Sequence, residues 1–524
     1  MPAKLPIDLS TFSEIRADKY LYVDKTKYAY DLVTGGRRFF FSRPRRFGKT
    51  LFVSTLKEIL IGNKELFDGL WIYKSDYEWK KHAVITLDLS TLGIVNAETL
   101  KAGLKEALER VSRDYDLNLT FTTNTPELIL YDVVRALKTK FGRVALLIDE
   151  YDNPILHALK DVKNASAIRD GIRNFFAAIK GLDADLNFLF ITGVSNFAKA
   201  GLFSGLNNLR VITLDGRFAS VCGYTEEEVT RYFDDYIQTW AKQKGIENSV
   251  LRQQIKGWYN GYHFSDKDEA VYNPFSFMNA LEIQEFDNFW FRSGTPTFLI
   301  EELKSEYRKS EFPLLYGDNF KVSKDTLGIF DVGAVPLSAL MFQTGYFTIV
   351  EYDHANGLYE LGYPNYEVKT ALQKHILTAL TNLDFGTTDK ISNQLKAAFN
   401  SGSVDEAVNL LKQLFYKVPY VLHIKKEKYY HALLQMAFDA AGIKAQSEYL
   451  ISHGRIDQIV ELPNWIYVIE IKFNKNADEA LKQIESMKYH EAFLTQGKPI
   501  VLLGLSFHRD PKTFDITYKE KRLL

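Results

Sequence analysis

Gly48, Lys49 and Thr50 have the types and the order of residues that bind the phosphates of a nucleotide. In such a loop, a lysine contacts the β- and γ-phosphates, a hydroxyl group ligates Mg²⁺, and backbone N–H groups at a helix start face the phosphate oxygens. An apolar run at residues 38–41 precedes the triplet, and a helical pattern follows it. Arg43 stands where the usual pattern has its first glycine, so a basic turn before a helix remains an alternative.

A second motif strengthens the nucleotide hypothesis. The apolar run at residues 144–148 ends in Asp149 and Glu150. At the end of a buried strand, an aspartate can hold the Mg²⁺ shell and a neighbouring glutamate can polarise the attacking water. Strands also end in acidic residues simply because the chain leaves into solvent. Together, however, the two motifs favour ATP binding, and they favour binding more strongly than hydrolysis.

Other polar residues could complete this site. Arg46, in the basic turn, is a further candidate for contact with the nucleotide. Thr192 and Ser195 follow another apolar run, where a polar group could meet the γ-phosphate. A simple cap at the end of a strand explains these two residues equally well.

The carboxyl-terminal region carries a different set of reactive groups. Strand-like runs at residues 455–461 and 465–473 are joined around Pro463. In a hairpin centred on that turn, Asp457 and Glu470 lie directly opposite each other, and Lys472 projects from the same sheet face. The spacing therefore predicts that two carboxylates and an amine converge on one spot.

Carboxylates placed opposite each other repel unless a cation lies between them. Mg²⁺ prefers carboxylate and phosphate oxygens, and Asp457 and Glu470 could be its ligands. Lys472 could then orient or deprotonate a water for attack on a phosphodiester. The alternative is a solvent-exposed ladder of Asp, Glu and Lys. Against it, Glu470 and Lys472 interrupt the otherwise apolar stretch YVIEIKF.

Five strand-like runs separated by helical patterns must position the first site. They lie at residues 38–41, 83–88, 144–149, 188–192 and 211–214. Their apolar residues are consecutive, which is typical of strands buried on both faces of a parallel sheet. We therefore predict an α/β fold, with a P-loop NTPase-like parallel sheet domain over residues 1–220.

The pattern changes after the fifth run. Residues 221–295 begin with a Thr225 cap and acidic residues, and they predict a helical lid or extension. Residues 296–385, with helices around a hairpin at 345–363, fit a winged-helix-like linker domain. The polar stretch at residues 386–407 marks the next boundary, so the last domain is expected over residues 386–524.

Composition is ordinary for a globular protein, with 46% apolar and 25% charged residues, and 524 residues are too many for one hydrophobic core. No apolar run reaches the roughly 18 residues that a membrane helix requires, and the first residues carry no signal or transit pattern. We expect a cytoplasmic protein with no membrane partner. The single cysteine, Cys222, excludes an intrachain disulfide and a cysteine-based zinc cluster.

These motifs resemble those of a bacterial family that joins an AAA-ATPase-like domain to a PD-(D/E)XK nuclease-like domain. The first part is similar over residues 5–290, through FSEIRADKYLYVDKT, FSRPRRFGKT, LLIDEYD, FITGVSNFAKAGLFSGLNNL and YNGYHF. The second part is similar over residues 400–505, through GRIDQIVE, YVIEIKF and EALKQI. The family has the same arginine-rich turn before Gly-Lys-Thr/Ser, which favours a phosphate loop of variant form.

The resemblance implies a role for each matching residue. Phosphate and Mg²⁺ binding is implied for Gly48, Lys49 and Thr50, a Walker B pair for Asp149 and Glu150, and the nuclease centre for Asp457, Glu470 and Lys472. Gln483 matches a supporting position on the helix after that centre. Glu427 is a doubtful match for a helical glutamate, because we expect it before its helix. No role is assigned to Arg173.

The resemblance also implies a carboxyl-terminal α/β restriction-endonuclease-like domain that acts on nucleic acid, with DNA favoured. ATP and Mg²⁺ are the implied cofactors, and the ATPase-like domain could form a homo-oligomer. The net charge of −1 provides no general attraction for nucleic acid. We expect an ATP-binding protein that controls a Mg²⁺-dependent nuclease. The alternative is a nucleotide-dependent switch or scaffold whose nuclease-like domain binds nucleic acid or protein without cleaving.

Overall fold

The structure is a computed structural model. It describes residues 2–196, 201–203, 205–206, 208–266, 269–292, 320–328, 332, 336–418, 427–451, 454–510 and 513–523. The described residues form two compact units. The first comprises residues up to 292 together with 320–365, and the second begins at Tyr366.

A five-stranded parallel sheet forms the core of the first unit. Its strands are β1 (Arg38–Ser42), β2 (Val84–Asp88), β3 (Val144–Asp149), β4 (Leu186–Gly193) and β5 (Arg210–Val211). They lie in the order β2-β3-β4-β1-β5, and all neighbours are parallel. All six residues of β3 are buried, as the consecutive apolar residues predicted. The expected P-loop NTPase-like sheet is confirmed.

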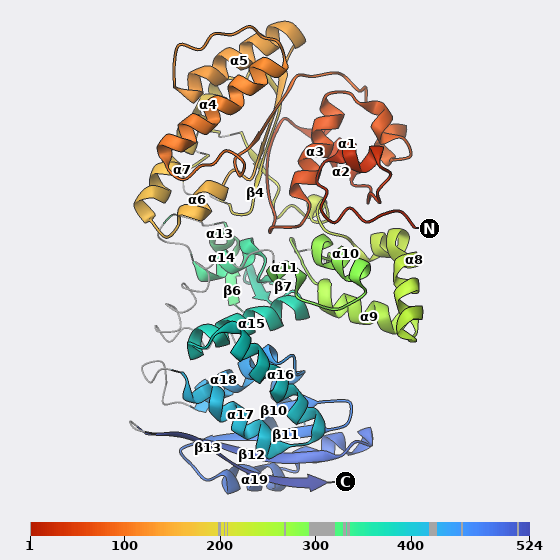
Figure 1. Cartoon of the computed structure of the whole chain (residues 1–524), viewed down its shortest axis with the longest axis vertical. Helices are drawn as coiled ribbons and strands as arrows, with labels where there is room; N and C mark the ends of the chain where they lie inside the picture. Colours follow the sequence, from red (N-terminus) through yellow and green to blue (C-terminus); the bar gives the residue numbers. More distant parts are fainter. Residues whose placement is uncertain are drawn as a thin grey trace. The chain divides into compact units, whose positions relative to one another are not determined.

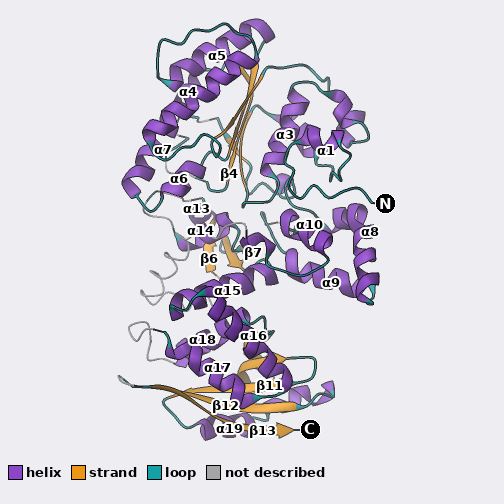
Figure 2. Ribbon diagram, viewed as in Figure 1, coloured by secondary structure: helices purple, strands orange, loops and turns teal. Residues whose placement is uncertain are grey.

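Helices cover both faces of this sheet (Figures 1 and 2). On one face lie α4 (Ala97–Asp114), α5 (Pro126–Phe141) and α7 (Val162–Gly181), and on the other lie α1 (Phe12–Ala17), α2 (Thr26–Gly35) and α3 (Lys49–Leu60). The short helices are η1 (Lys64–Phe67), η2 (Trp71–Lys74), α6 (Asn153–Ala158) and η4 (Gly216–Phe218). Because α3 begins directly after β1 and its loop, the start of α3 lies at the carboxyl end of the sheet.

A helical group follows the sheet, as the sequence predicted. It consists of α8 (Glu226–Lys244), α9 (Asn248–Tyr259), α10 (Pro274–Ile283) and α11 (Phe289–Arg292). Thr225 and Glu228 form a capping box at the start of α8. Phe233, Trp240 and Phe277 are fully buried in its core, where Leu5 from the amino-terminal segment also packs. This packing fixes the amino-terminal segment against the helical group.

A small antiparallel sheet completes the first unit. Its order is β6-β8-β7, with β6 (Phe320–Ser323), β7 (Thr348–Asp353) and β8 (Leu358–Gly362). The helices α13 (Lys324–Leu327) and α14 (Leu337–Thr344) accompany it. The predicted hairpin is therefore present. Residues 293–319 lie outside the described residues, so a winged-helix-like unit over 296–385 stays a prediction.

The second unit is a mixed sheet with helices on both faces (Figures 1 and 2). The strands are β9 (Ala445–Ile451), β10 (Gly454–Glu461), β11 (Ile466–Phe473), β12 (Ile500–Arg509) and β13 (Phe514–Leu523), in the order β13-β12-β11-β10-β9. Only β11 and β12 are parallel, and α19 (Ala477–Ser486) and η7 (Tyr489–Gln496) connect them. The other face carries helices from the group α15 (Tyr366–Thr381), α16 (Phe385–Ser401), α17 (Val404–Tyr416) and α18 (Glu427–Ala440).

The polar stretch at residues 386–407, expected to mark a boundary, is mostly helical and lies within the second unit. Ile391, Leu395 and Val404 are buried there, whereas polar neighbours such as Asn393 and Lys396 are exposed. Amphipathic helices thus account for its polarity. Throughout the described part of the chain, no helix combines the length and apolar character needed to cross a membrane.

Candidate functional sites

The loop between β1 and α3 has the backbone of a phosphate-binding turn. Gly48 adopts a φ of 92°, a left-handed conformation that glycine accepts without strain. Lys49 is the first residue of α3, and its Nζ lies 3.3 Å from the Pro44 carbonyl and 3.1 Å from Glu150 Oε1. Backbone N–H groups at this helix start have no partners within the helix, so they can bind an anion.

Arg43, which replaces the usual first glycine, is 1% exposed. It donates hydrogen bonds to the carbonyl groups of Ser42 (2.9 Å), Thr213 (2.8 Å), Phe218 (3.0 Å) and Ala219 (3.2 Å). Its guanidinium also lies 4.5 Å from the Phe41 ring centroid and 4.1 Å from that of Phe264. Burial lowers its pKa to about 9. The side chain therefore ties the phosphate loop to the segment after β5.

Asp149 ends β3 and faces the same loop. Its Oδ1 accepts a hydrogen bond from the Glu150 backbone at 2.9 Å, whereas its buried Oδ2 has no donor among the described residues. Burial and, to a smaller extent, the Glu150 charge raise the pKa of Asp149 to about 6, although Lys49 and the Thr50 hydroxyl oppose them. Such a carboxylate oxygen next to Thr50 suits a divalent ion that prefers oxygen ligands.

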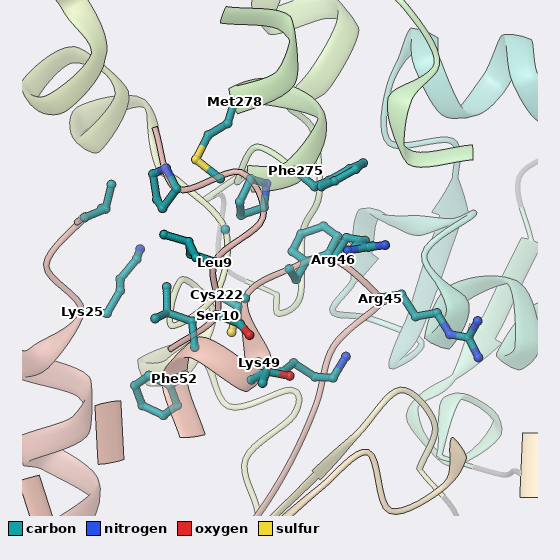
Figure 3. A pocket seen from close by; sticks show the side chains of 18 of the residues that line it. Leu9, Ser10, Lys25, Arg45, Arg46, Lys49, Phe52, Cys222, Phe275 and Met278 are labelled. Carbon is teal, nitrogen blue, oxygen red and sulfur yellow. The ribbon is translucent and has the colours of Figure 1, made fainter. Parts of the chain in front are cut away.

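A pocket of about 560 Å³ opens beside the phosphate loop. Its lining includes the amino-terminal segment around Leu9, the loop with Lys49 and Thr50, and helix α10 with Met278. Figure 3 shows side chains from these parts around the pocket. Arg46 also lines it, with its guanidinium 4.8 Å from the centroid of the Phe275 ring. The pocket has the size of a small-molecule site, with an apolar part and a phosphate-binding part.

Asp152 is a polar residue that the motif analysis missed. It is fully buried and accepts hydrogen bonds from the backbone of Val194 and from both the backbone and the hydroxyl of Ser195. Burial raises its pKa, with a further contribution from the Glu150 charge. Ser195 is thus held by Asp152, whereas the buried Thr192 hydroxyl has no partner in the described structure. Asp152 is the third acidic residue in LLIDEYD, and this position in the motif was the signal from which the sequence could have predicted its role.

The second site lies on the β10–β11 hairpin. Gln458 pairs with Ile469 and Ile459 with Val468, and the same register places Asp457 opposite Glu470. Asp457 Oδ2 accepts the Ile471 backbone N–H at 2.8 Å. The predicted register is confirmed. It brings the two carboxylates together because each residue of this antiparallel pair faces one partner.

Glu470 is 2% exposed, and its Oε1 accepts a hydrogen bond from Lys472 Nζ at 3.0 Å. Its buried Oε2 has no donor among the described residues. Burial and, to a smaller extent, the neighbouring Asp457 charge raise the pKa of Glu470 to about 7, although Lys472 opposes them. Burial disfavours the charged form of Lys472, but Glu470 and the other nearby carboxylates outweigh this, so its pKa is raised. Lys472 therefore stays protonated and can orient a water or a phosphate, whereas a protonated amine cannot act as a base.

Helix α18 contributes two residues to this centre. Glu427 is its first residue, which corrects the expectation that it lies before the helix, and Glu427 Oε2 accepts the Phe473 backbone N–H at 3.2 Å. His431 lies one turn later, with Nε2 3.5 Å from Asp457 Oδ2. Burial lowers the pKa of His431, although the nearby carboxylates oppose this. The motif analysis missed His431, but its i, i+4 spacing from Glu427 placed both residues on one helix face.

Gln483 lies on α19, next to the sheet. This helix packs over Gly504, the β12 partner of Glu470, so closely that a Cβ there would lie 2.5 Å from the Ala477 carbonyl oxygen. Gln483 itself is half-buried, and its side chain makes no hydrogen bond within the described residues. Its supporting role therefore stays a prediction.

Two family models match the chain. One described as "Predicted AAA-ATPase" matches residues 6–203, and one described as "PD-(D/E)XK nuclease superfamily" matches residues 425–515. A protein of Azotobacter chroococcum mcd 1, described as "Uncharacterized protein in vnfD 5'region", is 36% identical over 522 residues, which is 97% of each chain. The chain belongs to this AAA-ATPase-like and PD-(D/E)XK family. The fusion suggested by the motifs is thereby confirmed.

The AAA-ATPase-like match contains the phosphate loop and Asp149 and Glu150, and the nuclease-superfamily match contains Glu427, Asp457 and Glu470. A solved structure of Aeropyrum pernix ORC1 in complex with DNA is also similar, with a TM-score of 0.25 and 11% identity. The similarity covers 67% of this chain and 91% of that chain. So distant a likeness carries no argument about function.

Proposed function

We propose that this protein binds and hydrolyses ATP in its AAA-ATPase-like domain and that the nucleotide state controls metal-dependent DNA cleavage by its nuclease-superfamily domain. One observation, repeated in both domains, carries the proposal. Asp149 Oδ2, in a carboxylate that the Lys49 charge influences, and Glu470 Oε2, in a carboxylate paired with Lys472, are buried oxygens without a donor among the described residues. Such an oxygen costs about 1–3 kcal/mol unless a proton or a cation satisfies it.

In the first site, Lys49 contacts the terminal phosphates in place of its present contact with Glu150. Thr50 and Asp149 would hold Mg²⁺, which would supply positive charge beside the phosphates. Glu150, released from Lys49, orients the attacking water. The apolar part of the pocket, with Leu9 and Met278, takes the base.

In the second site, Asp457 and Glu470 would hold a divalent ion, which would supply activation of a water and stabilisation of charge on the scissile phosphate. Lys472 stays protonated next to Glu470, where it positions the phosphate or the attacking water. The Ile471 backbone N–H fixes one oxygen of Asp457. These side chains come from two adjacent strands, which hold them rigidly.

The test is cleavage of linear, circular and single-stranded DNA, with RNA as a further substrate, in Mg²⁺ or Mn²⁺ and with or without ATP. Lys472→Ala and Asp457→Asn should abolish cleavage and leave ATP binding unchanged, whereas Lys49→Ala should weaken ATP binding and alter the effect of ATP on cleavage. Lys475→Ala and Lys57→Ala, which remove exposed lysines near each site, are the matched controls.

If no nucleic acid is cut while ATP still binds, the cleavage proposal is wrong. The nuclease-superfamily domain would then be a binding module under nucleotide control. DNA retention by Asp457→Asn in a binding assay would identify nucleic acid as its ligand, and loss of retention would point to a protein partner.

A further inference from the structure

His431 is a half-buried histidine with a buried Nε2 close to Asp457, one of the two carboxylates of the nuclease-superfamily domain. Its side chain is 15% exposed, and its Nε2 lies 3.5 Å from Asp457 Oδ2. This nitrogen has no hydrogen-bond partner among the described residues. Asp457 Oδ2 already accepts the Ile471 N–H at 2.8 Å, so His431 faces the pair without being needed to hold it.

The distance between His431 Nε2 and Asp457 Oδ2 fits two ligands of one metal ion better than a hydrogen bond. Two ligands of one ion at bond lengths of about 2.1 Å lie about 3.0 Å apart in octahedral geometry and about 3.4 Å apart in tetrahedral geometry. The observed 3.5 Å is near this range and long for a hydrogen bond. Nε2 is thus placed as a neighbouring ligand of a shared ion would be.

We propose that His431 is a third protein ligand of the ion held by Asp457 and Glu470, and that it makes the centre prefer Mn²⁺ over Mg²⁺. This inference rests on the proposed function of the same site. It adds a nitrogen donor to a centre that the motifs described with oxygen donors alone.

The chemistry of the donors explains the preference. Mg²⁺ is a hard ion that favours oxygen ligands and gives up its waters reluctantly, whereas imidazole binds first-row transition ions well. Within the described residues, no three acidic, cysteine or histidine side chains already form a metal-binding cluster. Coordination of one ion would therefore require Glu470 and His431 to move closer to Asp457 than they lie in this structure.

If His431 only packs beside Asp457 and does not bind the ion, a different result is expected. Its loss would weaken the binding of Mn²⁺ and Mg²⁺ equally, because it would act through the shared carboxylate. Loss of a ligand would instead weaken Mn²⁺ binding by about tenfold or more and change Mg²⁺ binding little, so the ratio of the two affinities would fall.

The experiment is electron paramagnetic resonance of Mn²⁺ bound to the full-length protein without nucleotide, with electron spin echo detection of ¹⁴N coupling. The expected result is an imidazole ¹⁴N signal that His431→Gln abolishes while Mn²⁺ remains bound. Glu470→Gln should remove the bound Mn²⁺ itself and so assign the signal to this centre. His375→Ala, which removes an imidazole whose ring centroid lies 4.9 Å from that of Phe385 in the same unit, should leave the signal intact.

Calorimetric titration with Mn²⁺ and with Mg²⁺ completes the test, and circular dichroism confirms that each variant is folded. Mn²⁺ bound without ¹⁴N coupling, or an unchanged affinity ratio in folded His431→Gln, would overturn the inference and leave the proposed nuclease intact. Absence of any metal bound at Glu470 would overturn both.

Discussion

Arg43 occupies a position at which phosphate loops usually have glycine, and all four of its hydrogen bonds reach backbone carbonyl groups. Three of these carbonyls, at Thr213, Phe218 and Ala219, belong to the segment that follows β5. A buried guanidinium tolerates this environment because carbonyl dipoles and two aromatic faces replace its hydration. The loop is thus tied to its surroundings by a side chain, whereas a glycine could contribute only backbone contacts.

Arg43→Gly would restore the usual sequence pattern, yet we expect it to impair the protein. The free energy of unfolding of the first unit should fall by about 3 kcal/mol, because charge-assisted hydrogen bonds are lost and a cavity forms. ATP affinity should fall about tenfold as the loop loosens. Denaturant unfolding and nucleotide titration measure these effects.

Arg37→Ala, which removes an exposed arginine, is the control and should change the free energy of unfolding by less than about 0.5 kcal/mol. Unchanged ATP affinity in Arg43→Gly would contradict the inference that Arg43 holds the phosphate loop in place.

The pKa of Glu470, raised to about 7, makes metal binding depend on pH. A metal ion binds the carboxylate form, so protonation competes with it below that pKa. Mn²⁺ affinity should rise about tenfold between pH 6 and pH 8 and then level off. Calorimetry at several pH values measures this. An affinity that does not change over this range would show that Glu470 is already ionised at pH 6.

The raised pKa of Glu470 affects the stability of the metal-free protein in the opposite direction: stability falls as pH rises, whereas metal affinity increases. Because the folded pKa of Glu470 lies above its ordinary value of 4.5, the folded metal-free protein binds the proton more tightly than the unfolded chain. This contribution is therefore present below pH 4.5 and is lost as pH rises through about 7. Glu470→Gln should remove this part of the pH dependence of unfolding, with Glu491→Gln, an exposed residue, as the control.

At the scale of elements, the contact between α19 and β12 positions the nuclease centre. Gly504 pairs with Glu470, and a Cβ at Gly504 would lie 2.5 Å from the Ala477 carbonyl oxygen and 2.7 Å from the Leu481 nitrogen. Backbone atoms cannot give way as a flexible side chain can. The glycine is required because the helix lies directly on the sheet.

Gly504→Ala should therefore push α19 away from the sheet and lower the free energy of unfolding of the second unit by about 1–3 kcal/mol. Metal binding at Glu470 should weaken as its neighbour strand shifts. Thermal unfolding and Mn²⁺ titration measure the two effects. Gly386→Ala, where the nearest atom to a new Cβ is a side-chain oxygen at 3.2 Å, is the control and should be tolerated. Full metal affinity in Gly504→Ala would show that the helix contact does not position Glu470.

At the scale of the whole molecule, two compact units with separate cores predict two unfolding transitions. A ligand at 100 times its dissociation constant stabilises its own unit by about 2.7 kcal/mol. ATP should raise one transition temperature and Mn²⁺ without nucleotide the other. Lys49→Ala should remove the first shift and Glu470→Gln the second, as measured by differential scanning calorimetry. A single transition that both ligands raise would mean that the units unfold together.

The sequence by itself determined the elements whose signals are local. Consecutive apolar residues marked β1 to β4 as strands of a buried parallel sheet, and the Thr225 cap marked the start of α8. The run predicted at residues 211–214 shares only Val211 with β5, and both residues of β5 are exposed. The equal spacing of Asp457 and Glu470 from the turn at Pro463 determined their pairing, because antiparallel register follows from turn position. These features depend on residues close together in the chain.

Only the tertiary structure decided which distant groups meet. Three of the four carbonyl partners of Arg43 lie 170 to 176 residues away, and Asp152, after β3, accepts hydrogen bonds from Ser195, after the adjacent strand β4. His431 and Glu427 reach the β10–β11 hairpin from a helix that precedes it in the chain. Residue types and local spacing do not predict such long-range contacts. They arise when helices pack on a sheet, and the packing also buries the carboxylates and sets their pKa values.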